Sequence, residues 1–131
     1  KRLTAHIIKS LKENKEVVIV NGDFVRDYMY AKDIAGAFAK FVDSDVTGSV
    51  NICTGKGISL KDYAQTIAKK LNKENLVNIK YENLNQPMFI VGDNSRLINE
   101  VKYTPEYTFD KAIDEILKDW CFDENSWTKF A

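Results

Sequence analysis

The stretch Arg26-Asp27-Tyr28-Met29-Tyr30-Ala31-Lys32-Asp33 decides the fold predicted for this chain of 131 residues. Apolar residues follow it at helical spacing, namely Ile34, Ala37, Phe38, Phe41 and Val42. Asp33 is a good N-cap, so the pattern predicts a helix capped by Asp33 and an extended segment over residues 24–30. Arg26 then lies at the mouth of a strand-to-helix turn, where its planar cation can hold an anionic group such as a pyrophosphate.

Upstream of this stretch, the sequence predicts one helix, one strand and a turn. Leu3, Ile7, Ile8 and Leu11 share one helical face, and the polar run over residues 12–15 ends that helix. The β-branched run over residues 17–20 predicts a short strand. Asn21-Gly22-Asp23 predicts the turn after it, because glycine and its polar neighbours bend the chain readily.

Downstream, residues 49–53 read as a buried strand, and Gly55-Lys56-Gly57 as a plain turn. The strand is apolar on both faces, which is typical of a parallel sheet, so most of its neighbours are expected outside this chain. An exposed sheet edge then favours pairing with another copy, and we expect a homodimer.

The remaining elements follow from local signals. Ser59 and Asp62 form a capping box ahead of a helix of about three turns. Residues 78–81 predict a weaker strand, residues 83–87 a loop, and Asp93 the cap of a short helix. Thr108 or Asp110 begins a final helix, after which Trp127 and Phe130 lie in a tail that is docked loosely or frayed. Helices alternating with a few short strands indicate an α/β or α+β chain with too few strands for a complete doubly wound sheet.

Composition restricts the function classes. The chain is 44% hydrophobic and 29% charged, and its 19 basic and 19 acidic side chains cancel, so nothing indicates attraction to nucleic acid or to an anionic membrane. No membrane-spanning stretch or signal peptide is visible, and a cytoplasmic location is expected. Two distant cysteines and one histidine argue against a disulfide and against a metal site. The chain lacks an initiating Met and opens in mid-helix, so we expect a fragment.

No catalytic constellation is evident in this sequence. There is no glycine fingerprint after a strand, and no tyrosine stands four residues before a lysine inside an expected helix. His6 reads as a structural or surface residue, and the acidic residues of the final helix as its solvated face. Arg26 taken alone is more often part of a surface ion pair, whereas its functional interpretation is a two-pronged phosphate ligand.

Five blocks of sequence, in register, carry a resemblance that favours the phosphate-ligand interpretation of Arg26 over the ion pair. They are residues 26–35 (RDYMYAKDIA), 50–55 (VNICTG), 58–63 (ISLKDY), 93–97 (DNSRL) and 103–109 (YTPEYTF). The chain resembles the carboxyl-terminal part of extended short-chain dehydrogenase/reductases, the NAD-dependent epimerases and dehydratases of nucleotide sugars. The resemblance implies a fragment, residues 1–131, of a doubly wound Rossmann-like enzyme. This fragment is the smaller α/β substrate-binding part, with at least one strand of the parent parallel sheet.

The resemblance also implies which residues touch the substrate. The arginine matching Arg26 grips the diphosphate and the aromatic residue matching Tyr28 lies beside it, while Leu60 packs on the nucleoside. Ile19 and Asn21 border the base. The family's second phosphate-binding arginine falls at Asn83, where it is missing. Gln86 follows nearby as a further substrate-binding candidate, and Lys80 is a possible substitute cation. Asp33, Ser59 and Asp93 match helix caps with structural roles.

The sequence therefore predicts the substrate-binding portion of a nucleotide-sugar epimerase or dehydratase. NAD or NADP, the catalytic residues and their chemistry belong to an absent amino-terminal part, so this chain alone is expected to be inactive. The sequence around Gln86-Pro87-Met88 resembles enzymes that act on cytidine or thymidine diphosphate sugars more than it resembles uridine diphosphate epimerases. Two alternatives stay open. One is a stand-alone interaction or nucleic-acid-binding module with a basic opening helix, and the other is a related reductase of a non-sugar substrate.

Overall fold

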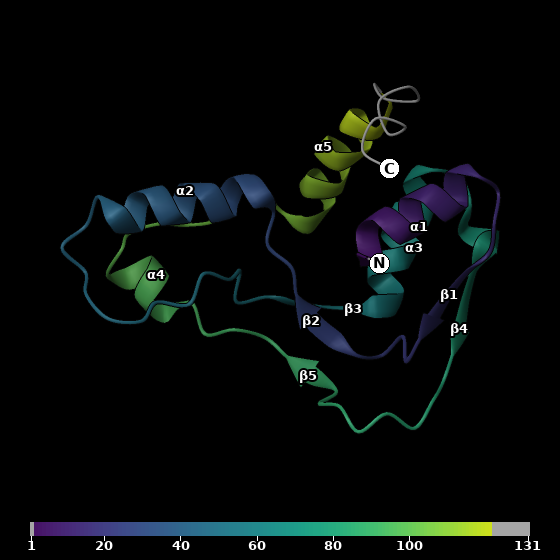
Figure 1. Cartoon of the computed structure of the whole chain (residues 1–131), viewed down its shortest axis with the longest axis horizontal. Coiled ribbons are helices and arrows are strands. Elements are labelled where there is room, and N and C mark those ends of the chain that lie inside the picture. Colours follow the sequence, from purple (N-terminus) through teal and green to yellow (C-terminus); the bar gives the residue numbers. More distant parts are fainter. Residues whose placement is uncertain (1, 122–131) are drawn as a thin grey trace.

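The computed structural model describes residues 2–121, which form five α-helices, five short strands and one 3-10 turn (Figure 1). In chain order these are α1 (Leu3–Lys12), β1 (Val17–Val20), β2 (Val25–Asp27), α2 (Ala31–Val42), β3 (Gly57–Ser59), α3 (Leu60–Lys70), η1 (Glu74–Leu76), β4 (Val77–Lys80), β5 (Phe89–Ile90), α4 (Ser95–Asn99) and α5 (Phe109–Cys121). The mixture of helices and parallel strands confirms the predicted α/β class.

The strands form two small sheets. β1 and β4 pair in parallel, with Val17 opposite Val77. β2 lies between β3, which is antiparallel to it, and β5, which is parallel to it. Arg26 is thereby set at the centre of the second sheet, opposite Ile58 on one side and Ile90 on the other.

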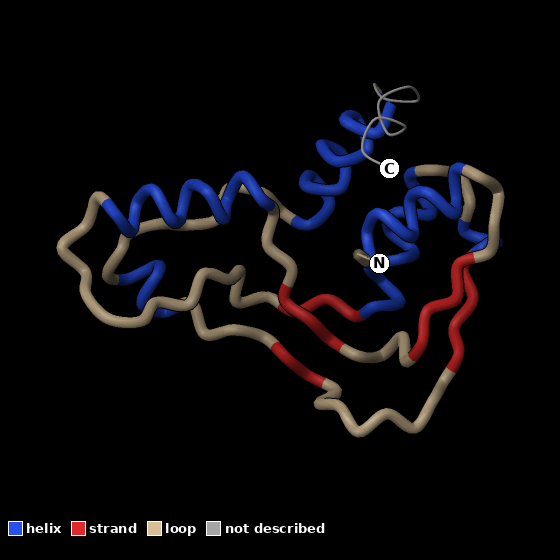
Figure 2. The backbone as a smooth tube through the Cα atoms, in the orientation of Figure 1, coloured by secondary structure: helices blue, strands red, loops and turns tan. Residues whose placement is uncertain are grey.

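The larger core lies in a part that we call the core lobe, made of α1, β1, α3, β4 and α5. α1 and α3 pack against the β1–β4 pair, and α5 adds Ile113 to the same core (Figure 2). Each helix is amphipathic, and on the predicted inward face of α1 Ile7, Ile8 and Leu11 are buried while Leu3 is partly buried. The buried side chains are Ile7, Ile8, Leu11, Val17, Ile19, Tyr63, Ala64, Ile67, Ala68, Val77 and Ile113.

A second, smaller core lies in the outer lobe, which we define as α2, α4 and residues 43–56 and 91–106. Figure 1 shows this lobe extending away from the core lobe, with α2 along one side of it. Its buried apolar residues are Ala37, Leu97 and Val101, with partly buried neighbours packed around them. The outer lobe therefore has little core of its own for its length of chain.

Asp33 is not the N-cap of α2, so that prediction is wrong. The helix begins two residues earlier, and its N-cap, Tyr30, makes no side-chain capping bond. Asp33 is instead 2% exposed, and its carboxylate accepts hydrogen bonds from Tyr103 Oη (2.9 Å), Glu106 N (2.8 Å) and Tyr107 N (3.0 Å). A cap can be read from local sequence, whereas these donors lie about seventy residues downstream.

Residues 49–53 do not form the predicted strand. The segment has no strand assignment, and no backbone–backbone bond joins it to another described segment. Val50 and Ile52 pack against the small core of the outer lobe, so their apolar character reflects burial on one side. The strand that forms nearby is β3, which begins at Gly57.

The predicted cap of α3 and the predicted start of α5 are confirmed, whereas the predicted cap of α4 is not. Ser59 Oγ accepts from Asp62 N at 3.0 Å and caps α3, as the capping box requires. The predicted short helix α4 is present, but Asp93 is not its N-cap, so that prediction is wrong: the N-cap is Asn94, and Asp93 lies one residue earlier and accepts from Ser95 N at 2.9 Å. Thr108 immediately precedes α5 and accepts from Lys111 N at 3.3 Å. Trp127 and Phe130 lie outside the described residues.

Candidate functional site

Arg26 occupies the middle of β2 and is half-buried. Its Nη1 donates to the carbonyls of Val25 (2.7 Å) and Met88 (3.2 Å), and its Cζ lies 5.1 Å from the centre of the Phe24 ring. None of the ion pairs among residues 2–121 involves Arg26. Its position is thus fixed by neutral groups, and its charge has no carboxylate counterpart in the described chain.

Asp27, the acidic neighbour of Arg26, is engaged elsewhere. Its carboxylate accepts from Thr54 N (3.1 Å), Thr54 Oγ1 (2.5 Å) and Gly55 N (2.9 Å). Gly55 adopts a φ of +70°, which glycine tolerates, so the turn can present both amides to one carboxylate. The surface ion pair that sequence alone favours for Arg26 is therefore absent from this part of the structure.

Asn21 and Leu60 lie at the corner where the β1–β2 turn meets α3. The side chain of Asn21 is buried and bridges the backbone of Glu82, donating to its carbonyl (2.9 Å) and accepting from its amide (2.8 Å). Leu60 packs against the main core, and its amide donates to Phe24 O at 2.9 Å. Ile19 is 3% exposed inside that core. The structure gives all three residues a packing or bridging role at this corner.

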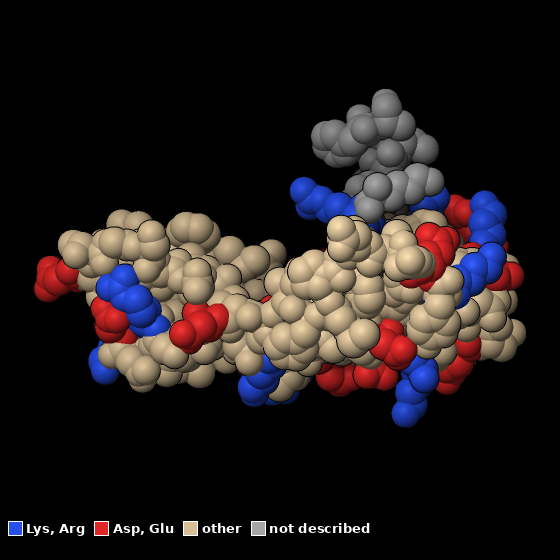
Figure 3. Space-filling model, turned by 90° about the horizontal axis from the view of Figure 1, so that it is seen from below, with Lys and Arg blue, Asp and Glu red and all other residues tan. Residues whose placement is uncertain are grey.

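Gln86 belongs to residues 81–90, all of which are exposed. This segment also exposes large apolar side chains, which are Tyr81, Leu84, Met88, Phe89 and Ile90. Figure 3, which shows the molecule from below, has a broad uncharged area over its middle, with charged groups at the two ends and along the lower edge. The carbonyl of Met88 in this segment accepts a hydrogen bond from Arg26, so the guanidinium lies next to a segment with exposed aromatic side chains.

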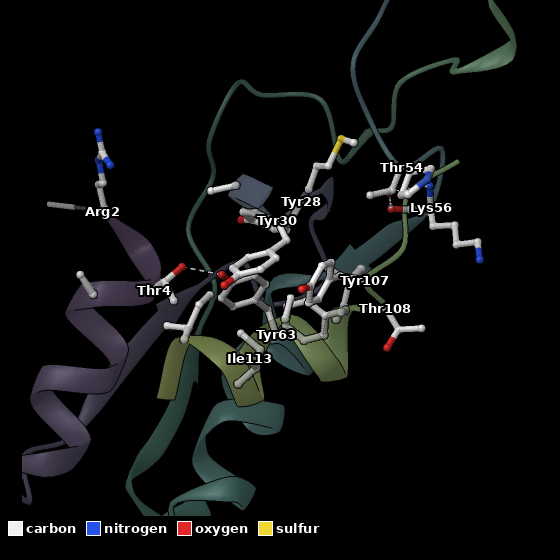
Figure 4. A pocket seen from close by; sticks show the side chains of 18 of the residues that line it. Arg2, Thr4, Tyr28, Tyr30, Thr54, Lys56, Tyr63, Tyr107, Thr108 and Ile113 are labelled. Atoms are coloured by element: carbon white, nitrogen blue, oxygen red, sulfur yellow. Dashed lines mark hydrogen bonds between the residues drawn. The ribbon is translucent and has the colours of Figure 1, made fainter. Parts of the chain in front are cut away.

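Tyr28 lines a cavity that does not include Arg26. An open cavity of about 1750 Å³ runs between α1, α5 and the start of α2, and Tyr28 lines it whereas Arg26 does not. Figure 4 shows the rings of Tyr28, Tyr30, Tyr63 and Tyr107 gathered there. Tyr28 and Tyr63 lie 4.4 Å apart between ring centres, and the Tyr63 hydroxyl is hydrogen-bonded to Thr4 Oγ1 at 2.5 Å.

Two tyrosines of this cavity, Tyr28 and Tyr63, are not activated as bases. Burial, reinforced by Tyr63 and opposed by Arg26, raises the pKa of Tyr28. Burial also raises the pKa of Tyr63, against a lowering effect of the bond to Thr4. Both hydroxyls stay protonated near neutral pH, where they can donate hydrogen bonds but not accept a proton.

The sequence does contain the Tyr-x-x-x-Lys spacing, at Tyr28–Lys32 and at Tyr107–Lys111, but outside the expected helices. Both tyrosines precede the helix that holds their lysine, so neither pair shares one helical face. Lys32 Nζ lies 3.7 Å from a carboxylate oxygen of Glu115 and 5.9 Å from the centre of the Tyr30 ring. Neither spacing therefore forms a catalytic pair here.

Within residues 2–121, no cluster of His, Cys, Asp and Glu is arranged to hold a metal ion. The same part of the chain contains no helix of the length and apolarity that crossing a bilayer requires. Cys53 is a free thiol whose pKa is raised, mainly by burial. The features with binding character are thus the Arg26 surface and the aromatic cavity.

Sequence reasoning found Arg26 but missed what surrounds it. The engagement of Asp27 depends on a turn 27 residues downstream, which no local signal reveals. The apolar residues scattered over 81–90 were visible in the sequence, but of those that the structure exposes only Leu84 lies in the loop expected over residues 83–87, so the exposed surface was not predicted.

Comparison with known proteins defines the family. Residues 1–116 match the family model described as GDP-mannose 4,6 dehydratase. The chain therefore belongs to this family, within the extended short-chain dehydrogenase/reductases that act on nucleotide sugars.

Individual relatives agree with this placement. The chain is 30% identical over 94 residues to dTDP-4-dehydro-6-deoxyglucose reductase of Escherichia coli, covering 71% of this chain and 30% of that protein. It is 20% identical over 120 residues to CDP-abequose synthase of Salmonella muenchen, covering 88% and 41%. The crystal structure of dTDP-glucose 4,6-dehydratase from Bacillus anthracis in complex with NAD superposes with a TM-score of 0.86 at 18% identity, covering 99% and 42%. The chain thus spans less than half the length of each of these proteins.

Proposed function

We propose that this chain is the substrate-binding part of an NAD(P)-dependent nucleotide-sugar epimerase, dehydratase or reductase, and that Arg26 holds the diphosphate. The observation that carries the proposal is the unbalanced charge of Arg26. A half-buried guanidinium with only carbonyl and ring contacts keeps donors for an anion, and a planar fork suits two phosphoryl oxygens.

The surroundings of Arg26 support a nucleoside next to the phosphates. Tyr81 and Phe89 are 67% and 66% exposed on the segment that borders the guanidinium, and Gln86 lies between them in sequence. An aromatic surface can stack on a base, whereas the side-chain amide of Gln86 can hydrogen-bond to it. Asn21 and Leu60 then support this surface from behind, and Tyr28 contributes to the neighbouring cavity.

The part played by these residues is positioning. A ligand held by its diphosphate presents its sugar in a fixed orientation, and orientation alone can contribute several kcal/mol to a rate. The described residues do not fit a dinucleotide, because the start of α2 carries Tyr30 and the buried Asp33 in place of a glycine-rich turn. We therefore assign NAD or NADP to polypeptide outside this chain.

The proposal is tested by calorimetric titration of the chain with UDP, dTDP, CDP and GDP. Arg26→Ala should weaken binding of the preferred diphosphate by about 10- to 150-fold, the range for one charge-assisted hydrogen bond of about 1.5–3 kcal/mol. Arg26→Lys should fall between, because it keeps the charge and loses the fork. Lys40→Ala, an exposed cation of α2, is the matched control and should bind like the unaltered chain.

Equal affinity of the Arg26→Ala and unaltered chains for every nucleoside diphosphate would contradict the role of Arg26. The preference among the four bases also tests the expected bias toward cytidine or thymidine. The names of the two relatives favour that bias, since one carries dTDP and the other CDP. The cytoplasmic location and the homodimer stay predictions.

The structure gives little support to a nucleic-acid-binding module. Of the basic residues of the opening helix, Lys9 lies 3.9 Å from Glu13, and Lys12 donates to Trp120 O at 2.7 Å. Arg2 lies on the rim of the aromatic cavity. These contacts divide the basic patch that such a module needs.

A further inference from the structure

The turn after β1 contains Asn21-Gly22, which is the one Asn-Gly pair in the sequence. Asparagine deamidates most readily before glycine, because glycine has no side chain to hinder attack by its own amide nitrogen on the preceding carboxamide. The proposed function makes no use of this reactivity. The turn therefore carries a potential modification site, and the surrounding structure decides whether it can react.

The geometry of the turn favours both residues of this labile pair. Asn21 has a φ of +55°, in the left-handed region that asparagine adopts more easily than most residues. A Cβ on Gly22 would lie 3.0 Å from Ile79 Cγ2 and 3.1 Å from Lys61 Cβ, so a larger residue would be crowded. The carbonyl of Gly22 also accepts from Lys61 N at 2.8 Å. Packing at this corner thus accounts for a pair that is chemically unstable.

Two hydrogen bonds hold the carboxamide of Asn21, and we call them the Asn21–Glu82 clasp. Nδ2 donates to Glu82 O at 2.9 Å, and Oδ1 accepts from Glu82 N at 2.8 Å. The side chain lies in a residue that is only 5% exposed. Deamidation makes the planar carboxamide carbon tetrahedral and expels its nitrogen, which requires both bonds to break and water to enter. The closed clasp therefore protects Asn21.

The other half of the clasp lies on a weakly held segment. Glu82 belongs to residues 81–90, all of which are exposed. A segment with little buried apolar surface opens locally at a low free-energy cost. Each opening at Glu82 frees the carboxamide of Asn21 and admits water, so the rate of opening controls the rate of reaction.

We infer that Asn21 is a deamidation site controlled by the Asn21–Glu82 clasp. In the open state the amide nitrogen of Gly22 attacks Cγ of Asn21 and forms a new C–N bond. The bond between Cγ and Nδ2 breaks, and the leaving nitrogen takes the proton of the Gly22 amide and departs as ammonia. Water then opens the cyclic imide at either of its two carbonyls, which gives aspartate or isoaspartate at position 21.

Neither product can close the clasp again. Aspartate keeps an acceptor for the amide of Glu82, but it has no donor for the carbonyl, so a carboxylate oxygen faces a carbonyl oxygen. Isoaspartate adds a carbon to the main chain and shortens the side chain, which moves the carboxylate away from Glu82. The modification therefore releases the start of the 81–90 segment irreversibly.

Incubation of the 131-residue chain at neutral pH, with and without urea, tests the protection. Peptide mass spectrometry measures deamidation at Asn21 and, as an internal control, at Asn72, which is exposed, has a φ of +55° and precedes Lys73. In urea, Asn21 should react faster than Asn72 and about tenfold faster than in the folded chain, because the two hydrogen bonds of the clasp are gone.

Variants at Glu82 test the clasp itself. Glu82→Pro removes the amide that donates to Asn21 Oδ1 and should raise the deamidation rate of the folded chain about tenfold. Glu82→Ala keeps both backbone groups, so it is the matched control and should react like the unaltered chain. Asn21→Asp reproduces one product and should speed hydrogen exchange of the Glu82 amide about tenfold.

Absence of isoaspartate at position 21 in the urea-unfolded chain would overturn the site. Equal rates at Asn21 in the folded and unfolded chains, or in Glu82→Pro and Glu82→Ala, would overturn the control by the clasp. Unchanged exchange of the Glu82 amide in Asn21→Asp would contradict the release of the segment. If Glu82→Pro fails to fold, the urea comparison and Asn21→Asp still decide. None of these readouts depends on nucleoside diphosphate binding, so the role of Arg26 can fail while this inference stands.

Discussion

Replacing Asp33 by alanine should strongly destabilise this chain. The carboxylate is buried and accepts three hydrogen bonds, two from backbone amides and one from the hydroxyl of Tyr103. A hydrogen bond to a charged group contributes about 1.5–3 kcal/mol, and a buried donor left without its acceptor costs a similar amount. Glu106 and Tyr107 lie partly at the surface, so water can replace some of the loss.

We therefore expect the free energy of unfolding to fall by about 3 kcal/mol for Asp33→Ala, and by about half of that for Asp33→Asn, which keeps one acceptor oxygen. For a chain of this size, the larger loss lowers the melting temperature by roughly 10 °C. Urea unfolding followed by circular dichroism measures both values. Asp45→Asn is the control, because Asp45 is exposed and should change stability little.

The location of the effect is as informative as its size. Asp33 joins α2 to residues 103–107, which lead into α5, so hydrogen exchange in residues 103–107 should increase first. If Asp33→Ala and the Asp45→Asn control both leave stability within about 0.5 kcal/mol of the unaltered chain, the three bonds do not anchor this segment, and our account of Asp33 is wrong.

Three further predictions concern Gly36, Ser59 and Tyr103. Gly36→Ala should lower stability by about 1 kcal/mol although alanine is the better helix former, because its Cβ would lie 2.7 Å from Tyr103 Oη; a gain in thermal unfolding would contradict this. Ser59→Ala should cost about 1 kcal/mol in urea unfolding by removing the cap of α3, whereas no loss would mean that the capping bond contributes nothing. Burial, and then the bond to Asp33, raises the pKa of Tyr103 from 10.0 to about 12. The folded state therefore binds this proton more tightly, so its contribution is complete below pH 10 and is lost as the pH rises toward 12. Tyr103→Phe should make the free energy of unfolding depend less on pH over that range. A pH profile identical to that of the unaltered chain would refute this account of Tyr103.

Features encoded by neighbouring residues were predictable from the sequence. The Ser59–Asp62 capping box, the apolar face of α1 and the β-branched run of β1 each depend on contacts within a few positions, and all three are confirmed. The resemblance also identified the family correctly, since it relied on the order of five blocks along the chain.

Features that depend on distant partners were not predictable. Asp33 looks like a cap in its local sequence, and only the folded chain brings the 103–107 segment to it. Residues 49–53 have the composition of a strand, but a strand also needs a neighbour to pair with, which the described chain does not supply. The charge on Arg26 is available only because Asp27 meets Thr54 and Gly55 in space.

The parallel pairing of β1 with β4 has a consequence for biosynthesis. Val17 meets Val77, which the ribosome adds sixty residues later. At a translation rate of about 5–20 residues per second, this interval lasts roughly 3 to 12 s, during which β1 has no partner strand. The nascent chain thus exposes an aggregation-prone β-branched segment well before β4 can pair with it. The rate of translation and the binding of a chaperone during this interval should therefore affect the yield of folded protein.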